Sequence, residues 1–136
     1  MFFEDLSVGQ SASFGKTITE ADILLFSAVS GDTNPVHINA EIAANSVFKG
    51  RVAHGMISAG LISAVLGTRL PGEGTVYLGQ TLKFRAPVHI GDTVTATVTI
   101  ATLTPGKNRV TLTTVCTVAG KTVLEGEALV MVPSRG

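Results

Sequence analysis

Residues 54–70 read HGMISAGLISAVLGTRL, and this stretch decides the fold. Its apolar residues are distributed around the helix so that almost no charged face remains. These residues are Met56, Ile57, Leu61, Ile62, Val65 and Leu66. A helix that is apolar nearly all round is a buried helix. Each glycine within it weakens the helix by roughly 1 kcal/mol relative to alanine, so tertiary packing must stabilise it. The stretch therefore predicts one buried helix that ends at Pro71 and Gly72.

The chain after this helix has the pattern of β-strands. Residues 93–100 alternate threonine with Val94, Ala96, Val98 and Ile100, which is typical of a half-buried strand. Further strands are predicted over 75–85, 109–118 and 122–132, with turns at 105–108 and 119–121. Long strands joined by short turns pair antiparallel. The sequence thus predicts an α+β domain in which a long antiparallel sheet wraps around one buried helix.

The chain before the buried helix is less regular. A first strand is expected within residues 10–18, followed by a helix over 20–30. Thr19 is placed to cap that helix together with Asp22, and Gly31 can adopt the positive φ that ends it. Residues 38–53 are expected to be irregular, with one helical turn near 41–45.

Length and composition limit the class of protein. A chain of 136 residues is most simply one domain, residues 1–136, that can bury a sizeable core. Lys+Arg and Asp+Glu both number 10, and zero net charge argues against nucleic acid as a partner. Cys116 is the single cysteine, and no apolar stretch reaches the ~20 residues of a membrane span. The N-terminus does not resemble a secretory signal, so a cytoplasmic protein is expected.

Residues 30–37, SGDTNPVH, place the carboxylate of Asp32 and the imidazole of His37 on one short segment. Gly31 and Pro35 restrict the backbone around them, so the segment should be stiff. Two proton-handling side chains on a stiff loop suit the activation of a water molecule. The alternative is a capping aspartate and a hydrogen-bonded loop histidine, and the residues alone favour neither interpretation.

The start of the buried helix is the second candidate element. Backbone N–H groups are unpaired at a helix start, so an N–H near Gly55 could bind a carbonyl oxygen that gains charge. The alternative is a glycine kept for tight packing. Asn34 is expected to support the 30–37 loop. Ser63 either bonds back to its own helix or donates to Asp32. No spacing of histidine and cysteine suits a metal, and no glycine pattern suits a nucleotide cofactor.

Four segments together carry a resemblance to a known family: residues 26–37, 53–56, 77–84 and 87–93. They resemble MaoC-like proteins of the hot-dog fold, and most of all the single-domain (R)-specific enoyl-CoA hydratases that supply monomers for polyhydroxyalkanoate synthesis. The resemblance implies a homodimer whose sheets join edge to edge, with an acyl-thioester tunnel near the interface. It also implies addition of water to trans-2-enoyl-CoA, giving (R)-3-hydroxyacyl-CoA, without a metal or an organic cofactor.

The same resemblance assigns roles by position. Asp32 and His37 would be the catalytic pair, and the Gly55 N–H would bind the thioester carbonyl. Ser63 would support Asp32, with Asn34 holding the loop. Leu66 and Leu129 would limit the length of the acyl chain.

Three other functions remain open at this point. A dehydratase acting on an acyl carrier protein would use the same chemistry, but it would need a basic rim, and the sequence shows no cluster of cations. A non-catalytic acyl-thioester-binding subunit and a thioesterase are also compatible with the fold.

Overall fold

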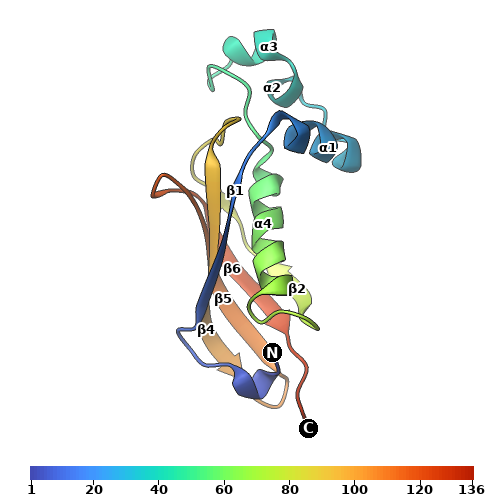
Figure 1. The fold of residues 1–136 in the computed structure, drawn as a ribbon, viewed down its shortest axis with the longest axis vertical. Coiled ribbons are helices and arrows are strands. Elements are labelled where there is room, and N and C mark those ends of the chain that lie inside the picture. Colours follow the sequence, from blue (N-terminus) through green and yellow to red (C-terminus); the bar gives the residue numbers. More distant parts are fainter.

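The computed structural model describes all residues from 1 to 136 (Figure 1). Its strands are β1 (Ser11–Thr17), β2 (Val76–Gln80), β3 (Lys83–Phe84), β4 (Thr93–Thr104), β5 (Arg109–Val118) and β6 (Lys121–Met131). Its helices are the 3-10 turn η1 (Phe3–Asp5), α1 (Glu20–Ser30), α2 (Pro35–Ile38), α3 (Ala40–Ala44) and α4 (Gly55–Thr68).

The strands form one antiparallel sheet in the order β1-β4-β5-β6-β2, with β3 also paired to β6. Helix α4 lies along one face of this sheet, and α1, α2 and α3 gather beyond its N-terminal end (Figure 1). This arrangement is the hot-dog fold, so the fold that the sequence predicts is confirmed.

The core lies between α4 and the inner face of the sheet. Ile62 and Val65 of α4 are fully buried, as are Val98 of β4 and Leu112 of β5. Alternate residues of β4 point to this core, while threonines occupy the outer positions. The period-two pattern therefore separates the two faces, and burial of its apolar half stabilises the fold.

The strand predicted over 75–85 is broken into β2 and β3, and Gly126 of β6 explains the break. The Thr81 carbonyl lies where a side chain at Gly126 would be, so any Cβ there would collide with it. The Thr81 N–H donates to the Glu127 carbonyl at 2.9 Å, and its hydroxyl accepts from the Glu127 N–H at 3.0 Å. The chain thus leaves the regular ladder at residues 81–82 and pairs with β6 again in the same register at Lys83.

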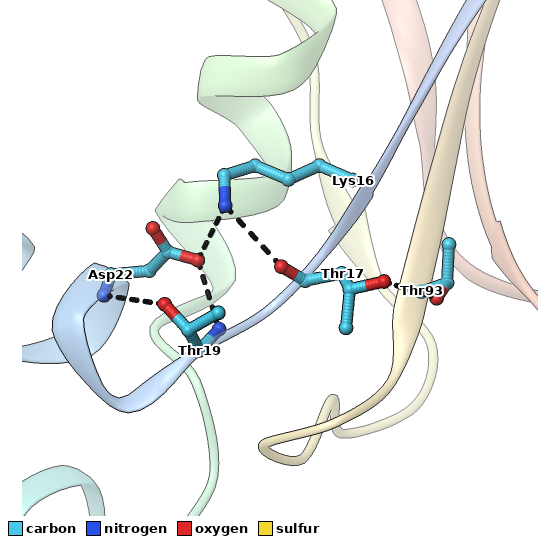
Figure 2. Close-up of polar contacts among 5 residues, drawn as sticks. All are labelled: Lys16, Thr17, Thr19, Asp22 and Thr93. Atoms are coloured by element: carbon cyan, nitrogen blue, oxygen red, sulfur yellow. Dashed lines mark hydrogen bonds and ion pairs between the residues drawn. The ribbon is translucent and has the colours of Figure 1, made fainter.

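A polar cluster fixes the start of α1 against β1 (Figure 2). The Thr19 hydroxyl accepts from the Asp22 N–H at 3.2 Å, and the Asp22 carboxylate accepts from the Thr19 N–H at 2.9 Å. Lys16 Nζ donates to the same carboxylate at 2.7 Å and to the Thr17 carbonyl at 3.3 Å. The bonds from Lys16 and from the Thr19 N–H lower the pKa of Asp22 below its usual value. The predicted capping is confirmed, and it sets the direction of the helix that leads to residues 31–37.

Helix α1 ends at Gly31, whose φ of 78° is left-handed as predicted. Of its apolar residues, however, only Ile23 is buried in the core of this chain. Only Ile23 and Ser27 are buried, whereas Leu25 and Val29 are 65% and 86% exposed. Apolar spacing correctly predicted the helix, but most of its apolar side chains have no cover within one subunit.

Cys116 is fully buried on the inner face of β5. Burial raises the pKa of its thiol to about 11, which leaves almost none of it as the reactive thiolate at neutral pH. The structure contains no helix that is both long enough and apolar enough to span a membrane.

Candidate active site

The segment between α1 and α2 is held by hydrogen bonds from side chains to the backbone. Asn34 caps α2, because its Oδ1 accepts from the Val36 N–H at 3.2 Å. Asp32 Oδ1 accepts from the Asn34 N–H at 3.2 Å, and Ser30 Oγ lies 3.1 Å from the Asp32 N–H. Asn34 therefore supports the loop as predicted. Pro35 begins a helical turn that the sequence analysis placed inside an irregular segment, since proline is well suited to the first helical position.

His37 is clamped by residues 51 and 52. Its Nδ1 donates to the Val52 carbonyl at 2.8 Å, and its own carbonyl accepts from Arg51 Nε at 2.7 Å. The Val52 N–H also donates to the Val36 carbonyl at 3.1 Å. Because a carbonyl can only accept, Nδ1 carries the hydrogen and Nε2 is free to bind another group.

Asp32 and His37 converge. A carboxylate oxygen of Asp32 and a ring nitrogen of His37 lie within 4.8 Å of each other, as does a ring nitrogen of His54. Two atoms that each lie about 2.8 Å from one water, at a tetrahedral angle, are about 4.6 Å apart. The spacing of the pair therefore suits a water held between carboxylate and imidazole.

The same three side chains have the composition of a transition-metal site, but not its geometry. The His37 and His54 rings are stacked, with centroids 3.8 Å apart and planes inclined by 26°. A metal binds the lone pair in the plane of each ring, and the planes of stacked rings do not meet at a common point nearby. His54 Nε2 is also engaged by the Asp32 carbonyl at 2.9 Å. The donor arrangement does not fit a bound metal.

A cavity of about 440 Å³ adjoins the pair, and its walls include His37 and Gly55. Most of the lining is apolar, with Val123 and Leu124 contributed by β6. Arg85 is its one permanently charged side chain. A mostly apolar cavity with a few polar groups at one place suits an acyl chain that carries a reactive head.

Gly55 opens α4, and neither its N–H nor that of Met56 donates to another residue. These groups are the unpaired donors that a helix start offers to an oxygen of a ligand. The Phe84 ring lies against Gly55 so closely that a Cβ there would overlap the ring. The tight packing of this glycine is confirmed, and its N–H, which has no partner in the protein, is placed beside the cavity, so its role as a donor to a carbonyl stays a prediction.

Three predicted site residues, Ser63, Leu66 and Leu129, do not line the cavity beside His37 in this chain. Ser63 is exposed and makes no hydrogen bond with Asp32. It follows Gly55 by eight residues, which is about 12 Å along a helix axis, so its expected support of Asp32 is not found within this chain.

Leu66 and Leu129 lie on different faces of the sheet in this chain. Leu66 is 2% exposed in the core, whereas Leu129 pairs with Thr111 on the opposite face of the sheet from the buried Ala128. Neither lines the cavity beside His37. The two leucines lie on opposite faces of the sheet in this chain, and their role in limiting acyl length stays a prediction.

The sequence analysis missed the side chain of His54, which contacts both members of the pair. It noted this residue only as the start of a helix. The sequence around a single buried histidine does not reveal which ring it stacks on, so the contact between His54 and His37 could not be predicted.

The family comparison agrees with this geometry. The model of the MaoC-like domain matches residues 5–125, so the chain belongs to the MaoC-like family.

Relatives of known activity cover nearly the whole chain. It is 65% identical over 135 residues to the (R)-specific enoyl-CoA hydratase of Rhodospirillum rubrum, covering 99% of this chain and 94% of that one. It is 50% identical to a 3-hydroxybutyryl-CoA dehydratase of Methylorubrum extorquens, covering 99% and 86%. The structure of the (R)-hydratase from Aeromonas caviae involved in PHA biosynthesis matches with a TM-score of 0.93 and 42% identity, covering 96% and 99%.

Proposed function

We propose that this protein is an (R)-specific enoyl-CoA hydratase, which adds water reversibly to trans-2-enoyl-CoA. The observation that carries the proposal is the convergence of Asp32 and His37, within 4.8 Å, beside a cavity that also presents the Gly55 N–H. The activities of the relatives support the same reaction class.

The reaction can be followed atom by atom. Asp32 and free Nε2 of His37 hold one water, and the carboxylate accepts its proton while the oxygen attacks C3 of the enoyl group. Electrons move from the C2–C3 double bond toward the thioester oxygen, where the Gly55 N–H stabilises the charge. The proton then returns to C2 from the same face, which gives syn addition and an (R)-3-hydroxyacyl product.

Two effects account for most of the expected acceleration. Positioned acid–base catalysis by the pair is worth roughly 10²–10⁴-fold. A hydrogen bond to the developing oxyanion is worth roughly 10²–10³-fold. The proposal includes no metal and no organic cofactor, because the thioester already makes C3 electrophilic and the stacked histidines do not suit a metal.

The proposal includes a homodimer joined through β2. This strand is at the edge of the sheet, so one side of its backbone is unpaired. Val76, Tyr77 and Leu78 of this strand are exposed apolar residues, and Met56 of α4 lies beside Tyr77 and Leu78. Helix α1 exposes three more, Leu24, Leu25 and Val29. A second copy of the chain would cover them. Analytical ultracentrifugation should give twice the mass of the chain, and a monomer at micromolar concentration would contradict this part.

A cytoplasmic location and a supply of monomers for polyhydroxyalkanoate synthesis complete the proposal. The first is supported by the single, buried cysteine, which forms no disulfide. The second is supported by the likeness to a hydratase with that role. Polyester content in a strain with and without the gene would test the second.

The central experiment follows the loss of enoyl absorbance of crotonyl-CoA, with chiral analysis of the product. We expect hydration to the (R)-3-hydroxy isomer, and Asp32→Asn should lower kcat by at least about 10²-fold because the base is lost. Asp5→Asn, which lies away from the cavity, serves as the control. Near-normal turnover by Asp32→Asn would exclude Asp32 as the base.

The substrates distinguish the alternatives. Faster turnover of crotonyl groups on a carrier protein than on coenzyme A would identify a dehydratase of fatty-acid synthesis. Release of free thiol would identify a thioesterase. Binding of crotonyl-CoA without turnover would identify a non-catalytic subunit.

A further inference from the structure

His54 contacts both catalytic residues, although the mechanism above gives it no role. Its side chain is 3% exposed at the start of α4, behind His37 and beside the Asp32 backbone. We propose that His54 is a positioning residue that holds Asp32 and His37 in the arrangement required for hydration. This inference rests on the proposed function.

The first contact fixes Asp32. His54 Nε2 lies 2.9 Å from the Asp32 carbonyl oxygen and 3.1 Å from Ser27 Oγ. Because the carbonyl has only lone pairs, Nε2 must carry the hydrogen that joins them. This hydrogen bond holds the main chain of Asp32, which is exposed and directly follows Gly31 with its left-handed φ. It thereby ties the carboxylate-bearing residue to the rigid start of α4.

The second contact fixes His37. The bond from His37 Nδ1 to the Val52 carbonyl holds one atom of the ring, but a single bond leaves the tilt of the ring free. The His54 ring restricts that tilt, because the two rings stack with centroids 3.8 Å apart. The ring of Phe26 of α1 also packs against His54, with the two centroids 4.8 Å apart. The hydrogen bond to Val52 and the stacked His54 ring therefore together fix the direction in which Nε2 of His37 points.

The remaining nitrogen shows that His54 is more than a space-filling side chain. Its Nδ1 is buried and has no hydrogen-bonding partner. Burial of an unpaired polar atom is unfavourable, so a phenylalanine or leucine would fill the same space at lower cost. The structure keeps an imidazole whose other nitrogen bonds Asp32, and the positioning role accounts for that choice.

Two substitutions separate the hydrogen bond from the ring. His54→Phe keeps a ring to stack on His37 but cannot donate to Asp32, whereas His54→Gln keeps an N–H donor without a ring. We expect kcat for crotonyl-CoA to fall about 10- to 100-fold in His54→Phe, since small displacements of catalytic groups have effects of this size. His54→Gln should retain more activity, and KM should change less than threefold in both. Ser27→Ala, which removes only the other contact of Nε2, is the matched control and should stay within threefold of wild type.

A double-mutant cycle with Asp32→Asn distinguishes positioning from general damage. If His54 acts through Asp32, His54→Phe should cause little further loss once Asp32 is replaced, because residues that act as a unit are non-additive. Three outcomes would overturn the proposal. His54→Phe could lower kcat equally in the wild-type and Asp32→Asn backgrounds. Both His54 variants could keep turnover within twofold of wild type, or both could fail to fold. Hydration by wild type that is abolished in Asp32→Asn would uphold the proposed function in each of these cases.

Discussion

The sheet with α4 and the segment from Ser30 to His54 are stabilised in different ways. The sheet uses repeated backbone pairing and a continuous apolar face, so each strand is held by many similar contacts. The segment from Ser30 to His54 is held by individual hydrogen bonds that do not repeat along the chain, such as those between Asn34 and Val36 and between His37 and Val52. Most of the buried core thus belongs to the first region, whereas the candidate catalytic pair belongs to the second, so we expect substitutions to separate stability from activity.

The largest effect on stability is expected from a substitution in the core between α4 and the sheet. Ile62→Ala removes a fully buried side chain of α4 and should lower the free energy of unfolding by about 2–5 kcal/mol. Urea unfolding measures this loss, and Ile62→Val should cost only about 0.5–1.5 kcal/mol. Turnover per folded molecule should stay near that of wild type. A large fall in kcat at unchanged stability would show that the two regions cannot be separated in this way.

An intermediate effect, mainly on kcat, is expected from a substitution in the segment from Ser30 to His54. Asn34→Ala removes the cap of α2 and should lower kcat about 10-fold by loosening the backbone that carries Asp32, with about 1 kcal/mol of stability lost. Asn39→Ala is a matched control, because Asn39 caps α3 in the same way, with its Oδ1 3.0 Å from the Ile42 N–H. Steady-state kinetics of the two variants should differ, and equal rates would make the Asn34 cap incidental to catalysis.

The smallest effect is expected at Asp22, which joins the start of α1 to Lys16 of β1. Its pKa is lowered in the folded protein from an ordinary value of 3.8, chiefly by Lys16. A lowered carboxyl pKa stabilises the fold above the ordinary value, and this stabilisation is lost as pH falls through the folded pKa. Asp22→Asn should therefore cost up to about 1 kcal/mol at pH 7 and progressively less below about pH 4. Urea unfolding across pH checks this, and a constant difference between the proteins would contradict it.

The sequence predicts the sheet and α4 well because their signals repeat. Threonine alternates with apolar residues along β4, and α4 is apolar on every side, so period and burial agree. The break between β2 and β3 has no such signal. It depends on Gly126 lying across from Thr81, and these residues are far apart in the sequence. Only the paired strands reveal that a main-chain carbonyl replaces a side chain there.

The site was predicted in part for a similar reason. Asp32, His37 and Gly55 stand in short local motifs, and the structure brings them to one cavity and its edge. The stacking of His54 on His37 and the clamp from Arg51 depend on how the loop folds back, which local sequence does not specify. Leu66 and Leu129 came from the resemblance alone, whereas Ser63 was also suggested by its place on the buried helix, and none of the three lines the cavity beside His37 in this chain.

The buried thiol of Cys116 has a practical consequence for the study of this enzyme. With its pKa raised to about 11, the native cysteine should resist maleimide reagents while the protein is folded. A cysteine introduced at an exposed position of α3 would then be the sole attachment point for a fluorophore or a spin label. The environment of α3 during turnover could then be recorded without first removing the native residue.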